Sequence, residues 1–265
     1  DFAEEIHCGQ SNSKGAYTRI IFGEDAEPGE IPWQVRLRMT FRSPDSVKSS
    51  FCGGFIWNRN TIITAAHCVQ ECPQSPNTNV SIVACIGDRK ISDNKDGQVC
   101  FNALSYKAHP QYSCTTIKND IAIIKTQDMK VPYFSDDGYG STNTICEPSL
   151  SDYTGKSLFV SGWGRYSHFH EGISDVLQKA PANVVPLTMC RRIYPGIDST
   201  QVCLQGPEGQ SVCNGDSGGP AFYVNQNGFA EAVGIASFAT ENCPWYGIFV
   251  YTSVAAFRDF IDANV

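Results

Sequence analysis

The sequence has few charged residues and no long apolar run. Charged residues make up 18% of its 265 positions, below the roughly 25% of an average soluble domain. No stretch of about 18 apolar residues occurs, which excludes a transmembrane helix. Basic residues are outnumbered by acidic ones, and the net charge of −7 disfavours nucleic acid and anionic membranes as partners. Hydrophobic residues still make up 42% of the chain, enough for a sizeable core.

Residues 1–5 lack the basic segment with which a signal peptide begins. Cysteine, by contrast, is plentiful, with 12 residues between Cys8 and Cys243. An even number of this size fits six disulfides formed in an oxidising compartment. No C-x-x-C pair occurs, and the short spacing of Cys68 and Cys72 is a poor match to a zinc site. We therefore expect a secreted protein whose signal has been removed, with disulfides and no metal centre.

Glycine and proline, at 23 and 14 residues, separate short runs rich in β-branched and aromatic residues. The runs are residues 31–39, 81–86, 121–124, 157–160 and 232–236. Strand-length runs at this spacing predict an all-β sandwich or barrel. Two segments have a helical pattern instead, 186–193 and 254–262. In the second, Phe257, Phe260 and Ile261 recur on one helix face and should dock on the core.

Three local motifs contain residues of a catalytic type, although each also has a plain structural interpretation. His67 lies in Thr64-Ala-Ala-His-Cys68 and could be a core histidine. Asp120, in Asn119-Asp-Ile-Ala-Ile-Ile124, could be a turn residue before a strand. Ser217, in Gly215-Asp-Ser-Gly-Gly-Pro220, could belong to a tight glycine turn. Together, a serine nucleophile, a histidine base and an orienting carboxylate form a catalytic triad, and the order His, Asp, Ser is one of its known orders.

The whole pattern resembles the chymotrypsin family of serine peptidases over about residues 20–265. Seven ordered segments carry the resemblance: Ile20-Ile-Phe-Gly23, Phe51-Cys-Gly-Gly54, Thr64-Ala-Ala-His-Cys68, Asn119-Asp-Ile-Ala122, Ser161-Gly-Trp-Gly164, Gly215-Asp-Ser-Gly-Gly-Pro220 and Val250-Tyr-Thr252. The likeness implies two six-stranded antiparallel β-barrels around a cleft, followed by a short C-terminal helix. His67 and Asp120 would come from the first barrel and Ser217 from the second.

The resemblance also implies a mechanism. His67 would take the proton of Ser217 as the hydroxyl attacks a peptide carbonyl, while Asp120 fixes the imidazole tautomer. The backbone N–H groups of Gly215 and Ser217 would form the oxyanion hole. No metal or organic cofactor is needed for this chemistry.

Four disulfides are implied by matching positions in the family: Cys8–Cys146, Cys52–Cys68, Cys190–Cys203 and Cys213–Cys243. Four cysteines remain, with three possible pairings. Cys85 and Cys100 flank a polar stretch that suggests a hairpin, so we pair them and assign Cys72 to Cys114. In some relatives the loop matching residues 87–98 binds calcium. Here Gln98 stands near where a second acid is needed, and we interpret Asp93 and Asp96 as solvated charges, so no calcium is expected.

Residues 1–19 resemble an activation peptide that precedes the peptidase domain 20–265. Cleavage between Arg19 and Ile20 would free an ammonium group that pairs with Asp216 and orders the site. Cys8–Cys146 would keep the cut peptide attached. Asn79, in the sequon Asn79-Val-Ser81, is a candidate glycosylation site.

The predicted primary pocket departs from the best-known relatives. Ser211 lies at its base, where an aspartate would select Lys or Arg, and its walls should include Ser237, Phe238 and Ala239. Phe249 stands where relatives usually carry glycine, and its ring would leave room only for a small apolar side chain, an elastase-like preference. Alternatively, Gly247 is the expected glycine and the strand carries a two-residue bulge, which would admit Phe, Tyr or Leu in a chymotrypsin-like manner.

Two functions follow from these observations. The first is an active endopeptidase, a monomer that acts on protein or peptide substrates and depends on a separate trypsin-like protease for activation. The second is a catalytically silent protease-like module that binds partners. All three triad residues are present, which favours the enzyme, whereas a pocket sealed by Phe249 would favour the binding module.

Overall fold

The strand β2 (Gln34–Arg42) shows how this sequence forms its sheets. Val35, Leu37 and Met39 are fully buried, and the residues between them are arginines that face outward, as in a strand with one buried face. The strand begins later than the predicted run 31–39, because residues 31–33 form a turn. In that turn Gln34 N–H donates to Ile31 O at 3.0 Å. The alternation therefore predicts the strand, and the turn sets its start.

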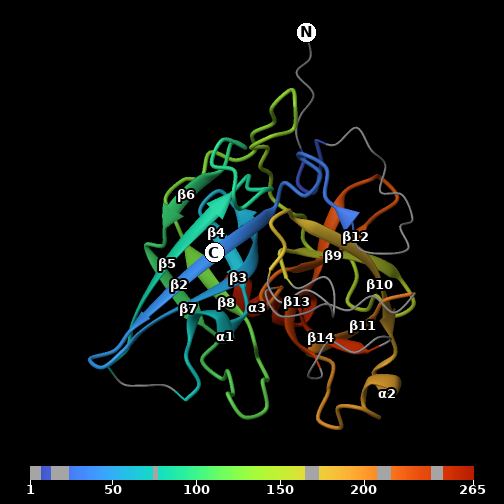
Figure 1. Cartoon of the computed structure of the whole chain (residues 1–265). Coiled ribbons are helices and arrows are strands. Elements are labelled where there is room, and N and C mark those ends of the chain that lie inside the picture. The colour runs from blue at the N-terminus through green and yellow to red at the C-terminus, as the bar shows by residue number, and fades with distance from the viewer. Residues whose placement is uncertain (1–6, 13–23, 74–76, 165–172, 208–215, 240–246) are drawn as a thin grey trace.

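A computed structural model describes residues 7–12, 24–73, 77–164, 173–207, 216–239 and 247–265. Its strands form two antiparallel sheets, which Figure 1 shows side by side. The first sheet contains β2, β3 (Val47–Asn58), β4 (Thr61–Thr64), β5 (Asn79–Ile86), β6 (Val99–Asn102), β7 (Ser105–Ala108) and β8 (Ala122–Lys125). The second contains β1 (Glu24–Asp25), β9 (Ser157–Gly162), β10 (Gln178–Val185), β11 (Gln201–Gln205), β12 (Pro220–Val224), β13 (Ala230–Ala239) and β14 (Ile248–Ser253).

The second sheet is a closed barrel. Six strands follow one another in the order β9, β10, β11, β14, β13 and β12, and β12 pairs with β9 to complete the ring. The short strand β1 pairs with the first two residues of β10, ahead of the part of β10 that pairs with β11. One of the two predicted six-stranded barrels is therefore confirmed.

The first sheet is a curled half-barrel of seven strands in the order β6-β5-β2-β3-β4-β8-β7. Its two edge strands, β6 and β7, follow one another along the chain. Between them, Ala103 N–H donates to Ile82 O of β5 at 2.9 Å and Leu104 N–H donates to Lys125 O of β8 at 2.8 Å. Residues 99–108 thus connect β5 at one edge of the sheet with β8 at the other. The break at residues 103–104 divides this connection into two strands, β6 and β7, where a six-stranded barrel would have one.

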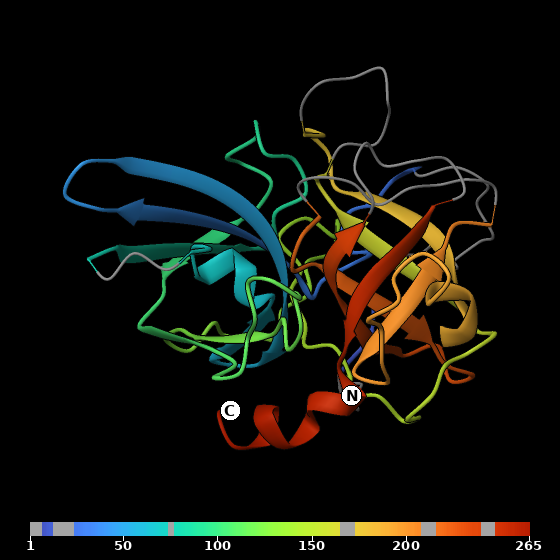
Figure 2. The same ribbon diagram turned by 90° about the horizontal axis from the view of Figure 1, so that it is seen from below.

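The helices are shorter than predicted. In the segment 186–193 only α2 (Leu187–Cys190) is α-helical, and 254–262 divides into a 3-10 turn at Ala255–Phe257 and the helix α3 (Arg258–Asp262). The predicted apolar face is confirmed, because Phe257 and Ile261 are buried and Phe260 packs against the core. The rings of Phe257 and Phe260 lie 5.3 and 4.7 Å from that of His109, which follows β7. The end of the chain, seen below the sheets in Figure 2, therefore fastens onto the first sheet.

Candidate active site

His67 and Asp120 meet because two neighbouring strands end at the same level. β4 pairs with β8 in a register that places Thr64 opposite Ala122. The chain leaving β4 enters the short helix α1 (Ala66–Val69), and Asp120 lies just before β8. Asp120 is fully buried and accepts the backbone N–H of His67 at 2.9 Å. His67 Nδ1 lies 2.8 Å from the other carboxylate oxygen, so the imidazole is held by its Nδ1 side.

The second sheet supplies two more partners of Asp120. Ser237 Oγ donates to Asp120 Oδ2 at 2.5 Å, and Thr252 Oγ1 donates to the Asp120 carbonyl at 2.9 Å. Ser237 lies at a register shift in β13, between Ala236 and Phe238. Bulges of this kind re-aim a side chain near a functional site. The sequence predicted Ser237 only as part of the pocket wall, whereas in the structure its hydroxyl also donates a hydrogen bond to Asp120.

The charges of this pair are coupled. Burial by itself would raise the pKa of Asp120, but His67 and the hydrogen bonds from His67 and Ser237 outweigh burial and hold the pKa below its usual value. Burial by itself would lower the pKa of His67. The negative charge of Asp120 and its hydrogen bond outweigh burial, so the net effect is a pKa raised from the usual 6.5. Asp120 is therefore an anion that favours a protonated His67, the property required of an orienting carboxylate.

Ser217 is held between the two sheets. Its carbonyl accepts Gly53 N–H from β3 at 2.7 Å, and the next residue, Gly218, donates to Ala236 O at 2.8 Å. Gly218 has a φ of +78°, and a Cβ there would collide with Thr64 Oγ1 and Gly53 O. Glycine is required at this position for both reasons. Within the described residues, no hydrogen bond joins Ser217 Oγ to His67 Nε2, a bond that often tightens only when substrate binds.

Asp216 lies against two glycines of the Ser161-Gly-Trp-Gly164 motif. Its Oδ1 accepts Gly164 N–H at 2.9 Å, and a Cβ at Gly162 or Gly164 would overlap the carboxylate. This contact explains both glycines of the motif. The other predicted parts of the activation and oxyanion machinery, Arg19, Ile20 and Gly215, lie outside the described residues.

The register of β14 bears on the primary pocket. Phe249 is buried, and it stands directly opposite Ala239 of β13 and Leu204 of β11. The pairing of β11 with β14 runs without a shift from Gln201–Thr252 to Gln205–Ile248. The alternative of a two-residue bulge between Gly247 and Tyr251 is therefore wrong for residues 248–251. Phe238 packs edge-on against Tyr194 at 5.4 Å, while Ser211 lies outside the described residues.

Five of the six predicted disulfides are formed: Cys8–Cys146, Cys52–Cys68, Cys72–Cys114, Cys85–Cys100 and Cys190–Cys203. The sixth, Cys213–Cys243, lies outside the described residues. Cys52, His67 and Cys68 come close enough together to resemble a metal site. Because the two cysteines are joined to each other, they have no thiolates to offer a metal.

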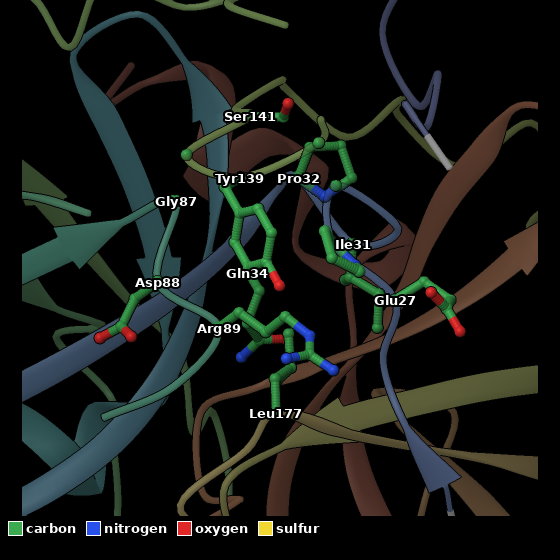
Figure 3. Close-up of a pocket in the computed structure, with 14 residues that line it drawn as sticks. Glu27, Ile31, Pro32, Gln34, Gly87, Asp88, Arg89, Tyr139, Ser141 and Leu177 are labelled. Atoms are coloured by element: carbon green, nitrogen blue, oxygen red, sulfur yellow. The ribbon is translucent and has the colours of Figure 1, made fainter. Parts of the chain in front are cut away.

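The loop 87–98 differs from our expectation at one residue. Asp96 was interpreted as a solvated charge, but it is buried, and one of its oxygens accepts the N–H groups of Arg89 and Lys90, each at 2.9 Å. Asp88 is also buried and pairs with Arg36 Nε at 2.5 Å. In Figure 3 its carboxylate points away from a cavity of about 20 Å³, roughly the room for a single water. The carboxylate of Asp88 is thus already paired with the guanidinium of Arg36.

A larger groove of about 400 Å³ adjoins the His67–Asp120 pair. His67 and Ser237 line it on the side of the pair, and Phe41, Glu71, Tyr112 and Ile117 line the rest. The bond between Cys72 and Cys114 forms part of its wall and ties the loop after His67 to the loop before Asp120. Sequence patterns predicted this disulfide as part of a wall of the substrate cleft, but they did not indicate that Glu71 lines the groove.

The sequence of this chain is similar to those of known proteins over most of its length. The family described as Trypsin matches residues 20–261. Melanization protease 1 of Drosophila melanogaster is 30% identical over 277 residues, which cover 93% of this chain and 66% of that protein, just under two thirds. Chymotrypsin-C of Mus musculus is 31% identical over 258 residues, covering 93% and 89% of the two chains. Trypsin delta of D. melanogaster is 31% identical over 257 residues, covering 93% and 88%.

None of the helices in the described segments has the length and apolar character that crossing a membrane requires. The paired sheets, the His67–Asp120 pair beside the Gly-Asp-Ser-Gly turn, and the family match over most of the chain lead to one conclusion. This chain belongs to the trypsin family of serine endopeptidases.

Proposed function

We propose that Ser217, His67 and Asp120 cleave peptide bonds through an acyl-enzyme. The observation that carries the proposal is the 2.8 Å contact between His67 and the buried Asp120, beside the turn that bears Ser217. His67 accepts the proton of Ser217 as the hydroxyl attacks the carbonyl carbon, and then delivers it to the leaving amine. Asp120, fixed by Ser237, keeps the imidazole in the required tautomer. The N–H groups of Gly215 and Ser217 stabilise the oxyanion, by roughly 3 kcal/mol per donor in comparable sites.

Activity is expected to rise with pH as His67 loses its proton, because only neutral imidazole can accept the proton of Ser217. Asp120 raises the pKa of His67 above 6.5, so the midpoint should lie above that value. The measurement is kcat/KM on an uncharged peptide between about pH 5 and 8. In Asp120→Asn the residual activity should have a lower midpoint, since the negative charge is gone. A flat wild-type profile would count against His67 as the base.

The preferred substrate residue before the cleaved bond is small and apolar. Support comes from the register of β14, which pairs with β11 without a shift and sets the buried Phe249 opposite Ala239 of β13. Ser211 and Phe238 complete the proposed pocket, and no acid at its base would pair with Lys or Arg. Profiling the activated enzyme on peptides varied at this residue tests the preference. Organophosphate labelling of Ser217 distinguishes this enzyme from a silent binding module, which would not be labelled.

Shortening Phe249 should widen this pocket. In Phe249→Ala, hydrolysis after Phe or Leu should gain at least about tenfold relative to hydrolysis after Ala, because the ring no longer fills the space. Phe222→Ala is the matched control: Phe222 on β12 is also fully buried, but it packs against Trp33 and not in the cluster that holds Phe249, so it carries a similar cavity cost without the change of preference. An unchanged ratio in Phe249→Ala would mean that the ring lies outside the pocket.

The chain is made as a zymogen, cut between Arg19 and Ile20. Support comes from the reach of the new terminus. Glu24 pairs with Lys179 in register, and Lys179 with Ser161, so Glu24 lies two strand spacings, about 10 Å, from Ser161. The four steps from Ile20 to Glu24 span up to about 14 Å when extended. Ser161 precedes Gly162 and Gly164, on which Asp216 lies. The ammonium of Ile20 can therefore reach that carboxylate and form the activating ion pair.

The five disulfides support secretion, because such bonds persist in oxidising compartments. Asn79, the candidate glycosylation site, is exposed at the start of β5, where a glycan would not disturb the sheet. Protein or peptide substrates and an activating protease are the expected partners of a monomeric enzyme. One relative, Melanization protease 1, is by its name a protease connected with melanization.

A further inference from the structure

The groove of about 400 Å³ has a chemical character of its own. Among the described residues that line it, Glu71 is the only acidic one and His67 the only basic one. Phe41, Tyr112 and Ile117 provide apolar surface. A groove with apolar walls and a single carboxylate complements a long side chain with a positive end, because the stem packs on the walls and the charge reaches the acid.

The carboxylate of Glu71 has two contacts, an ion pair with an exposed lysine and a hydrogen bond from a hydroxyl. Its side chain is only 24% exposed, whereas Lys48, 3.6 Å away, is 71% exposed. A pair with so exposed a lysine contributes little and is easily displaced. The second contact, from Thr78 Oγ1 at 3.3 Å, comes from a neutral hydroxyl. A cation that approaches from within the groove would therefore meet a half-buried carboxylate, where an ion pair is stronger than at the surface.

The opposite wall is rigid before any ligand arrives. The Cys72–Cys114 bond fastens the loop that carries Ile117. Ile117 has a φ of +51°, uncommon for a β-branched residue, and its N–H donates to Ser113 O at 2.7 Å. Rigid walls spare the entropy of ordering a loop upon binding. The groove is therefore a formed site rather than a gap between loops.

We propose that this groove binds an arginine or lysine side chain of the substrate, from a residue directly next to the one in the primary pocket, with its positive end at Glu71. The inference rests on the proposed peptidase function. In an extended peptide, neighbouring side chains point to opposite sides. The primary pocket walls, Ala239 and Phe249, belong to the second sheet. The next side chain then points toward the first sheet, where the groove opens beside His67.

The test uses peptides with a fixed primary residue and with Arg, Lys, Met or Glu at the position on either side of it. Met has a similar stem without the charge, so the Arg-to-Met ratio of kcat/KM isolates the ionic contribution. We expect Arg to exceed Met by about tenfold at one of the two positions. The ratio should fall as salt is added, since screening weakens the pair.

Glu71→Gln keeps the shape of the side chain and should bring the ratio close to one. Glu27→Gln, in the loop before β2 and on a different cavity, is the matched control and should keep the wild-type ratio. In Lys48→Met the preference should be no weaker, because a competing cation is gone. The proposal is overturned if the wild-type enzyme shows no preference for Arg over Met at either position. It is also overturned if that preference survives in Glu71→Gln. Failure to cleave any peptide after activation would instead contradict the proposed peptidase function.

Discussion

Ser217→Ala is expected to lower kcat by about a millionfold, the scale of comparable nucleophile knockouts. The substitution removes the attacking oxygen, while the backbone contacts of Ser217 with Gly53 and of Gly218 with Ala236 remain. The fold should therefore be unchanged, and near-ultraviolet circular dichroism on the activated variant checks this. Activity is measured as kcat on the best peptide from the profiling experiment.

The triad should also act as one unit. His67→Ala added to Ser217→Ala should cause little further loss, because a base without a nucleophile has nothing to activate. The double variant distinguishes this cooperative mechanism from two independent contributions, which would multiply. More than about a thousandth of wild-type activity in Ser217→Ala would show that another group attacks the peptide.

Purified zymogen incubated alone should never produce the Ile20 terminus, whereas a trace of trypsin should produce it completely. Cleavage after Arg19 needs a pocket acid to receive the guanidinium, since a buried unpaired charge costs several kcal/mol. The proposed primary pocket offers Ser211 and Phe249 instead. Sequencing of the new N-termini over time, at high zymogen concentration, measures the outcome.

Ser217→Ala zymogen is the control for this experiment. With trypsin it should be cut at the same rate as wild type, since the bond is the same and only the foreign enzyme acts. Spontaneous appearance of Ile20 in the wild type that accelerates with time and is absent in Ser217→Ala would reveal self-cleavage. That result would contradict both the dependence on an activator and the assignment of the pocket.

Much of the fold and site could be predicted because the informative features are local. Short runs between glycines and prolines predicted strands, and the motifs around His67, Asp120 and Ser217 carried the family resemblance. Strand pairing then brought those motifs together, as Thr64 opposite Ala122 illustrates. The Cys85–Cys100 pair was predictable for the same reason, since the two cysteines stand opposite each other on β5 and β6.

What could not be predicted depends on departures from regular pairing or on contacts between distant loops. A register shift turns Ser237 toward Asp120, and no property of the sequence Ser-Phe-Ala reveals that direction. Asp96 is buried because the N–H groups of Arg89 and Lys90 need an acceptor, a demand that arises only once the loop has folded. The groove at Glu71 requires two loops about 40 residues apart, and only their three-dimensional arrangement creates it.

Asp120 lies just before β8 of the first sheet, yet Ser237 and Thr252, which bind it, belong to the second sheet. This division has a consequence for inheritance. A gene segment that encodes either sheet alone carries no complete catalytic apparatus, however well that half folds. Recombination between related genes can exchange halves only if the hydrogen bonds of Asp120 with Ser237 and Thr252 are preserved across the junction. Selection for activity therefore acts on the two halves as one heritable unit, even though their hydrogen-bonded sheets are separate.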